Sequence, residues 1–169
     1  MPEYLFPSLF LFACILLFAA AIDLFTLTIP NRVSLALLAA FLLNALVRGI
    51  PLSTMIEHLA VGIVLLAIGF TIFARGWIGG GDAKLLACIG LWVGPEAVVA
   101  FISWTAILGG YLAALFSVYR RITPPLWIIS QPWAMRLHNS KEGIPYGVAL
   151  AGAGLLVYPK TVWMAGLPS

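Results

Sequence analysis

Long apolar runs, separated by short polar or Pro/Gly-rich breaks, make up most of this chain. Such runs predict membrane-spanning helices, because a helix satisfies its own backbone hydrogen bonds where lipid offers no partners. The six predicted spans cover about residues 4–24, 33–47, 55–74, 83–93, 97–119 and 145–165. The second and fourth runs are short for a full crossing, so neighbouring helices or extra turns must complete them.

The breaks between the runs hold residues that commonly end helices. The sequences TLTIPNR, RGIP, RGWIGGGD and GPE separate the first five runs. A longer and more polar stretch, which contains several prolines, connects the fifth run to the sixth. Proline removes a backbone donor and clashes with the preceding helical turn, so it marks a boundary rather than an interior. The chain shows no internal repeat, and we predict a single domain over residues 1–169.

Composition agrees with this pattern and excludes a water-soluble globule. Of the 169 residues, 63% are hydrophobic and 9% are charged, and the mean hydropathy is +1.08. Soluble domains carry about 25% charged residues. We therefore expect an all-α, polytopic membrane protein with lipid as a partner. The chain has no basic tract that would indicate nucleic-acid binding, and the sequence leaves the oligomeric state open.

One alternative for the first run is a cleaved secretory signal. The sequence FAAAID near its end imitates a cleavage site. A secretory signal starts with a positively charged region, but the residues before this run include Glu3 and neither Lys nor Arg. We expect the first run to be retained as a helix.

The basic residues predict the orientation in the membrane. Seven of them fall in the first, third and fifth connections: Arg32, Arg75, Lys84, Arg120, Arg121, Arg136 and Lys141. The even connections and the C-terminal end hold only Arg48 and Lys160. Because loops rich in Lys and Arg stay in the cytoplasm, this bias predicts cytoplasmic odd connections and both termini outside.

The chain has only 6 acidic residues, and four of them have ordinary explanations. These four are the terminal Glu3, Glu57 at the start of the third run, Glu96 in an external turn, and Glu142 in the polar fifth connection. We expect Glu57 and its neighbour His58 to face lipid headgroups. Asp23 and Asp82 remain.

Asp23 and Asp82 are candidates for chemistry. Asp23 lies among apolar residues near the end of the first run, and Asp82 follows three glycines at the start of the fourth. A carboxylate at such a depth is costly and indicates function by default. The predicted topology places both at the cytoplasmic ends of their helices. Two carboxylates held close share one proton, so that one can activate water while the other polarises a carbonyl group.

Other interpretations of the two aspartates stay open at this point. Asp82 alone would suit a helix N-cap, and Asp23 alone would suit a polar contact between helices. As a pair they would also suit a small transporter or ion-binding membrane protein, or a scaffold with structural acids. The glycines before Asp82 would let a peptide backbone approach closely. We find no metal-ligand cluster and expect no cofactor.

Three motifs in this order resemble the type IV prepilin peptidases, which are intramembrane aspartic proteases. GGGDAK fits the GxGDxK pattern of that family, Asp23 followed by Ile-Pro-Asn is similar to its other aspartate region, and IPYG resembles its last-helix signature. The GxGD pattern alone is shared with presenilin-type proteases. The resemblance runs from the first predicted helix to the sixth.

The resemblance implies roles for individual residues. Asp23 and Asp82 become the catalytic pair, and Lys84 an electrostatic or structural neighbour. The other residues that it marks as shaping the site or binding substrate are Pro30, Asn31, Gly79, Gly81 and Pro145. The implied substrate is a type IV prepilin or pseudopilin, cut after a short basic leader on the cytoplasmic side of the bacterial inner membrane.

The chain departs from the longer family members in one respect. Those members carry paired CxxC motifs between the first two helices and also methylate the new N-terminus. Here a step of about ten residues without cysteine separates Asp23 from Val33. This argues against methyltransferase activity. The compact form resembles the peptidases of tight-adherence (Flp-type) pili or archaellin-type peptidases, and the sequence PYGVALA favours the former.

Overall fold

The computed structural model describes residues 5–140 and 142–165, so Glu3 and Lys141 lie outside the described residues. Over this part of the chain the regular structure is helical throughout, which confirms the all-α prediction. The elements are α1 (Leu5–Thr26), α2 (Asn31–Arg48), α3 (Leu52–Ala74), α4 (Gly80–Tyr119), α5 (Leu126–Ile129), α6 (Pro132–His138), α7 (Tyr146–Val157), the 3-10 helix η1 (Tyr158–Lys160) and α8 (Val162–Ala165).

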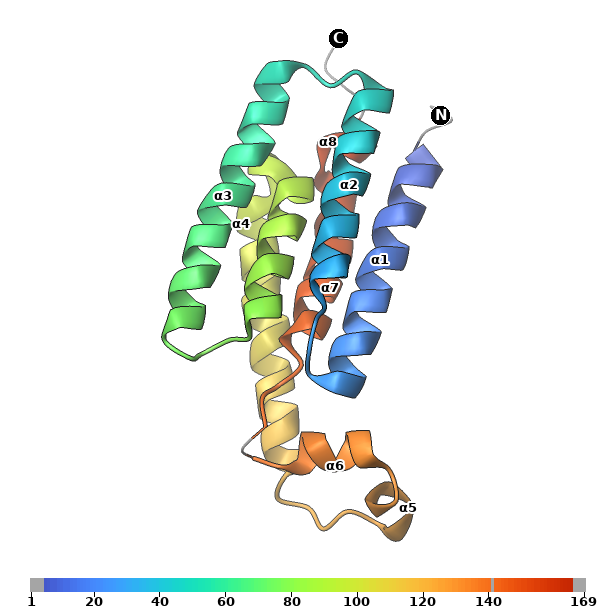
Figure 1. Cartoon of the computed structure of the whole chain (residues 1–169), viewed down its shortest axis with the longest axis vertical. Coiled ribbons are helices and arrows are strands. Elements are labelled where there is room, and N and C mark those ends of the chain that lie inside the picture. The colour runs from blue at the N-terminus through green and yellow to red at the C-terminus, as the bar shows by residue number, and fades with distance from the viewer. Residues whose placement is uncertain (1–4, 141, 166–169) are drawn as a thin grey trace.

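Four of the described helices are long and apolar enough to cross a membrane, namely α1, α2, α3 and α4. They lie alongside one another with α7 in a bundle, and α5 and α6 lie beyond one end of it (Figure 1). The connections α1–α2 and α3–α4 are at the same end as α5 and α6, whereas the α2–α3 connection and both chain ends are opposite. The count of six spans and the orientation stay predictions.

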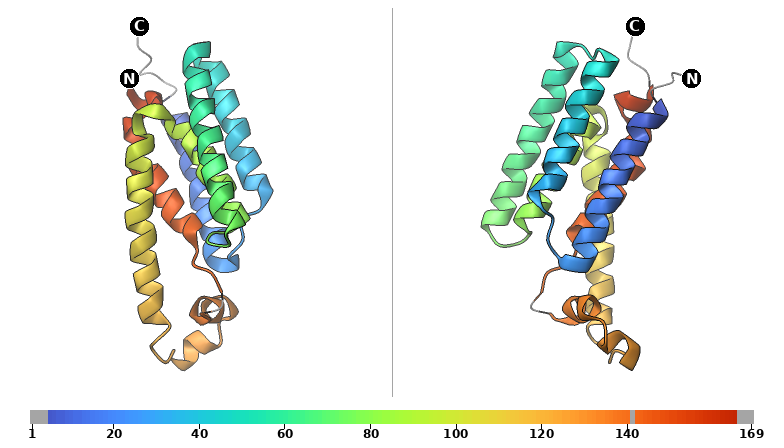
Figure 2. Two further views of the ribbon diagram at one scale, coloured as in Figure 1. Left: turned by 90° about the vertical axis from the view of Figure 1, so that its left-hand side faces the viewer. Right: turned by 45° about the vertical axis from the view of Figure 1, so that its right-hand side comes forward.

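Helix α4 is bent back on itself at Gly94. This residue has φ 69° and ψ −179°, and Pro95 follows it. A positive φ is readily available to glycine, and proline cannot supply the backbone donor of a continuing helix. The first half of α4 therefore runs one way and the second half returns in the opposite direction (Figure 2). The break predicted at the sequence GPE is confirmed.

The last predicted run is not one helix. A continuous helix over residues 145–165 was expected, but α7 ends at Val157 and is followed by η1 and α8. Pro159 sits inside η1, and its missing N–H explains why the α-helix does not continue.

The polar connection before α7 is held to the second half of α4 by Arg120. Its guanidinium donates to the carbonyl oxygens of Leu137 (2.9 Å), Glu142 (3.1 Å) and Gly143 (2.9 Å). Arg136 donates to the carbonyl oxygen of Phe25 at 2.7 Å and so links α6 to the end of α1. The sequence predicted a loop here but neither short helix.

Large aromatic side chains fill the core at the end of the bundle that carries the chain ends. Phe12, Phe41, Trp92, Tyr158 and Trp163 are all buried and their rings contact one another. His58 packs against this cluster and is 1% exposed, with its Nδ1 2.7 Å from the carbonyl oxygen of Leu91. The expectation that His58 faces headgroups is therefore wrong, because its ring completes the aromatic core.

Candidate active site

Asp23 is buried in the last turns of α1 and faces α7. Its side chain is 3% exposed, and its Oδ2 accepts a hydrogen bond from the backbone N–H of Gly147 at 2.7 Å. Gly147 lies in the first turn of α7, where backbone N–H groups have no partner within the helix. A helix N-terminus also favours negative charge. The N-terminus of α7 thus holds a carboxylate that lies 124 residues earlier in the chain.

Asp82 occupies the third position of α4 rather than the N-cap. The N-cap is Gly79, whose N–H donates to Oδ2 of Asp82 at 3.2 Å. This bond satisfies one donor at the helix start. Oδ1 is also buried but has no hydrogen-bond partner among the described residues. A capping role therefore accounts for one carboxylate oxygen and leaves the other available.

Ile29 brings the three sequence motifs into contact. Any Cβ at Gly81 would lie 2.9 Å from the Ile29 carbonyl oxygen, and one at Gly147 would lie 2.8 Å from Cδ1 of Ile29 and 2.8 Å from Oδ2 of Asp23. Each glycine is needed for this close packing. The space at Gly81 is consequently filled by the backbone of the α1–α2 connection. The approach of a substrate backbone expected at the glycines stays a prediction, and at Gly81 the neighbouring backbone is that of Ile29.

The two aspartates lie at the same end of the bundle, as expected from the charge pattern. Asp23 precedes the α1–α2 connection and Asp82 follows the α3–α4 connection (Figure 1). Ile29 packs against Gly81, the neighbour of Asp82, and against Gly147, which bonds Asp23, so both aspartates lie next to this one residue. Both are largely withdrawn from solvent, so each depends on its protein neighbours for stabilisation.

Lys84 and Asn31 join the starts of two helices. The ammonium group of Lys84 donates to Oδ1 of Asn31 at 2.7 Å. Both side chains are exposed, and the bond connects the first turns of α4 and α2. These two residues therefore link the aspartate motifs, whereas the hydrogen bonds that the described residues donate to the two carboxylates come from Gly79 and Gly147.

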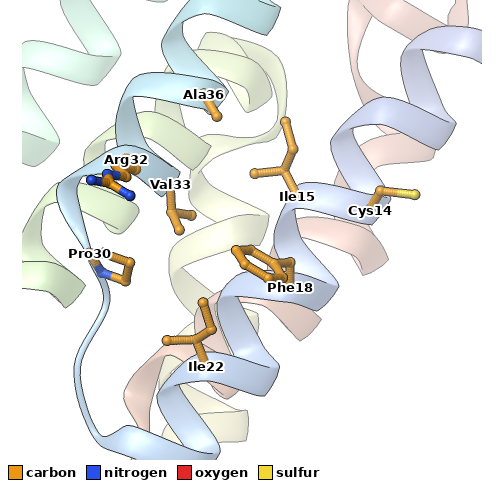
Figure 3. A pocket seen from close by; sticks show the side chains of 8 residues that line it. All are labelled: Cys14, Ile15, Phe18, Ile22, Pro30, Arg32, Val33 and Ala36. Atoms are coloured by element: carbon orange, nitrogen blue, oxygen red, sulfur yellow. The ribbon is translucent and has the colours of Figure 1, made fainter.

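The two prolines marked by the resemblance have different positions. Pro145 is buried and forms the N-cap of α7, directly before the turn that holds Asp23. Pro30 is exposed and lines a groove of about 560 Å³ between α1 and α2. Apolar side chains dominate that groove, with Arg32 at one side and neither aspartate among its lining residues (Figure 3). Pro30 thus ends the connection that Ile29 occupies and faces a groove that neither carboxylate lines.

A second cavity adjoins Asp82. It has a volume of about 400 Å³ and opens between α3, both halves of α4 and α7. Its lining residues are Ile72, Ile78, Asp82, Leu86, Thr105, Ala106, Gly109, Gly110, Tyr146 and Leu150. The arrangement combines a mostly apolar chamber with a carboxylate oxygen that has no partner among the described residues. Such a site suits acid–base chemistry on an apolar or amide-containing ligand.

Several residues that build this site were not among the sequence candidates. Ile29 belongs to the Ile-Pro-Asn motif and Gly147 to the IPYG motif. Their places in these motifs were the sequence evidence that could have identified them. Thr105 and Tyr146 line the cavity. Thr105 stands out in the sequence only as a hydroxyl within an apolar run, and nothing in the sequence pairs it with Asp82.

Comparison with known proteins agrees with these motifs. The model of the type IV leader peptidase family matches residues 10–114. A prepilin leader peptidase/N-methyltransferase of Bacillus subtilis (strain 168) is 26% identical over 157 residues, which are 91% of this chain and 55% of that protein. The chain thus spans about half the length of this curated relative. No solved structure gives a significant match.

Proposed function

The chain belongs to the type IV leader peptidase family, and from that premise we propose that it is an intramembrane aspartic endopeptidase with Asp23 and Asp82 as its catalytic pair. Its substrate is the leader of a type IV, Flp-like prepilin or pseudopilin. The observation that carries the proposal is the packing of Ile29 against Gly81 and Gly147, since it gathers three distant motifs around two buried carboxylates.

The proposed chemistry needs one ionised and one protonated carboxyl group. The ionised aspartate takes a proton from water as the water oxygen attacks the scissile carbonyl carbon, and the protonated one donates to the carbonyl oxygen. Collapse of the tetrahedral intermediate breaks the C–N bond, and a carboxyl proton passes to the leaving amine. The unpaired Oδ1 of Asp82 supports its part in this exchange.

We place the reaction at the cytoplasmic face of a bacterial inner membrane. The α1–α2 and α3–α4 connections and the α5–α6 region share the aspartate end of the bundle (Figure 1). They carry Arg32, Arg75, Arg120, Arg121 and Arg136, which supports a cytoplasmic position. In this proposal the chain crosses the membrane six times as one domain, with both termini outside, and it lacks a methyltransferase function.

The proposal is tested by replacing each aspartate with asparagine in the full chain. Asp23→Asn and Asp82→Asn preserve side-chain size but cannot exchange the proton. We expect each to lower leader cleavage of a co-expressed Flp-type prepilin by at least about 10²-fold, measured by the mobility shift of the pilin on immunoblots. Membrane levels of both variants should match the unchanged protein.

Glu57→Gln is the matched control, because Glu57 is exposed near the opposite end of the bundle. It should cleave normally. Full cleavage by either aspartate variant would refute the catalytic pair. Ion flux through reconstituted wild-type protein, lost in the same variants without any peptidase activity, would support the transporter interpretation instead.

A further inference from the structure

The cavity beside Asp82 holds a second polar atom without a partner. Oγ1 of Thr105 is buried and, like Oδ1 of Asp82, has no hydrogen-bond partner among the described residues. Both residues line the same cavity of about 400 Å³. Asp82 starts the first half of α4, and Thr105 is in the half that returns beyond Gly94. The two unpaired atoms therefore come from two helix segments on different sides of one chamber.

Three other hydroxyl groups in the long helices form local hydrogen bonds. Thr26, Thr71 and Ser103 each donate at 2.8 Å to the carbonyl oxygen four residues earlier. Thr105 has the same option one turn back but does not use it. A polar group left unpaired in an apolar environment costs free energy, so the conformation of Thr105 points to a ligand that completes the bond.

Glycines clear the space next to Thr105. Gly109 is one helical turn farther along and shares its face of α4. A Cβ on Gly109 would lie 3.0 Å from Cε1 of Tyr146, whereas one on Gly110 would meet nothing within 4 Å. The helix surface at this point is largely backbone, and Tyr146 and Leu150 of α7 form the facing wall. An extended chain fits such a surface better than a bulky helix does.

The chemistry of the chamber identifies the ligand as a peptide. An acyl chain of a lipid would match the apolar wall but could not bond the hydroxyl of Thr105 or Oδ1 of Asp82. An extended peptide next to its scissile bond offers backbone N–H and C=O groups for both atoms and apolar side chains for the walls. We propose that Thr105 binds the backbone of the substrate beside the cleavage site, and that the Gly109–Gly110 surface accommodates that extended segment. This inference rests on the proposed peptidase function.

The test compares two substitutions at Thr105 in the full-length protein in proteoliposomes, with a purified prepilin as substrate. Thr105→Val keeps the shape and loses the hydroxyl, while Thr105→Ser keeps the hydroxyl. We expect Thr105→Val to lower kcat/KM by about tenfold, mainly through KM, because one hydrogen bond is lost. Thr105→Ser should remain within about twofold of wild type, which a purely packing role for the methyl group would not give.

Thr71→Val is the control, since the Thr71 hydroxyl already bonds within α3. The kcat/KM of this variant should not change.

Gly110→Leu is a second test of the proposal, because the position has room for a side chain and the leucine would enter the cavity. It should leave the protein folded and raise KM at least tenfold.

The outcomes separate the two proposals. A wild-type protein that cleaves no prepilin overturns the proposed function together with this inference. Normal KM in both Thr105→Val and Gly110→Leu, with an active wild type, overturns the inference alone and indicates that lipid or water fills the chamber. Equal loss in Thr105→Ser and Thr105→Val overturns the assigned hydrogen bond.

Discussion

The two ends of the bundle differ in where their buried polar atoms lie. At the end with the chain termini, the indole N–H of Trp92 donates to the Leu37 carbonyl oxygen (2.9 Å) and that of Trp163 donates to the Trp92 carbonyl oxygen (2.6 Å). At the aspartate end, Oδ1 of Asp82 and Oγ1 of Thr105 are buried without a described partner. Nε2 of His58 and Nδ2 of Asn44 at the first end are also buried without a described partner. What distinguishes the aspartate end is that its two unpaired atoms line one shared cavity of about 400 Å³.

This difference suggests that the aromatic end mainly stabilises the fold and the aspartate end mainly serves function. The aromatic end buries wide apolar surfaces, which are the main source of stability in packed cores. The aspartate end buries carboxylates, which cost free energy, and depends on glycines for close packing. Substitutions at the first end should therefore reduce folding, and substitutions at the second should reduce catalysis.

The largest expected effect is the removal of Trp92 from the aromatic core. Trp92→Ala should lower the free energy of unfolding by about 3–5 kcal/mol, because it leaves a cavity at the centre of the cluster. The measurement is reversible unfolding in detergent. Trp127→Ala is its control, since Trp127 is 72% exposed on α5; a similar loss in this variant would contradict the assignment of the core.

The next effect is expected at Gly81, where a substitution should lower both stability and the rate of cleavage. Gly81→Ala places a methyl group against the Ile29 backbone, which cannot move as a flexible side chain would. We expect about 1–3 kcal/mol of destabilisation and at least tenfold slower cleavage. Gly143→Ala should behave like wild type, because nothing lies within 4 Å of a Cβ there. Unimpaired cleavage by Gly81→Ala would disprove the role of this packing.

A smaller effect should follow from the loss of a single bond at the aromatic end. Trp163→Phe keeps an aromatic ring but leaves the Trp92 carbonyl oxygen without its indole donor. The expected loss of stability is about 1–2 kcal/mol, with leader cleavage unchanged at temperatures where the protein is folded. Lower activity without lower stability would contradict the separation of the two ends.

The smallest effect is expected for the tether between Lys84 and Asn31. Both side chains are exposed, so their bond competes with water and contributes little. Lys84→Ala and Asn31→Ala should each slow cleavage by roughly two- to fivefold. The double variant should be no slower than the worse single variant if the bond is the shared cause. Additive losses would show separate roles.

The sequence predicted the features that depend on local pattern and charge. Helix positions followed from apolar runs, and the break at Gly94 followed from a Gly-Pro pair. The shared level of Asp23 and Asp82 followed from the distribution of basic residues. None of these three predictions depends on which helices pack against one another.

The remaining features depend on contacts between distant segments. The pairing of Ile29 with Gly81 and Gly147 and the meeting of Asp82 with Thr105 are set by helix packing, to which many sequence positions contribute. His58 was misplaced for the same reason, because its burial comes from ring contacts with Phe41 and Trp163. The last run was predicted as one helix because its composition is mostly apolar. Pro159 was the sequence signal for the interruption by η1.

The reversal at Gly94 also has a mechanical consequence. Asp82 and Thr105 are on the two arms of α4, and the kink at Gly94 that joins these arms would be the hinge of any movement between them. Each arm is roughly 17 Å long at 1.5 Å per residue, so a rotation of about 5° at the hinge moves its far end by roughly 1.5 Å. That distance separates a made hydrogen bond from a broken one. Any change in the angle at Gly94 would therefore change the width of the chamber, and His58 and Glu96, which pack against Gly94, would restrict such a change.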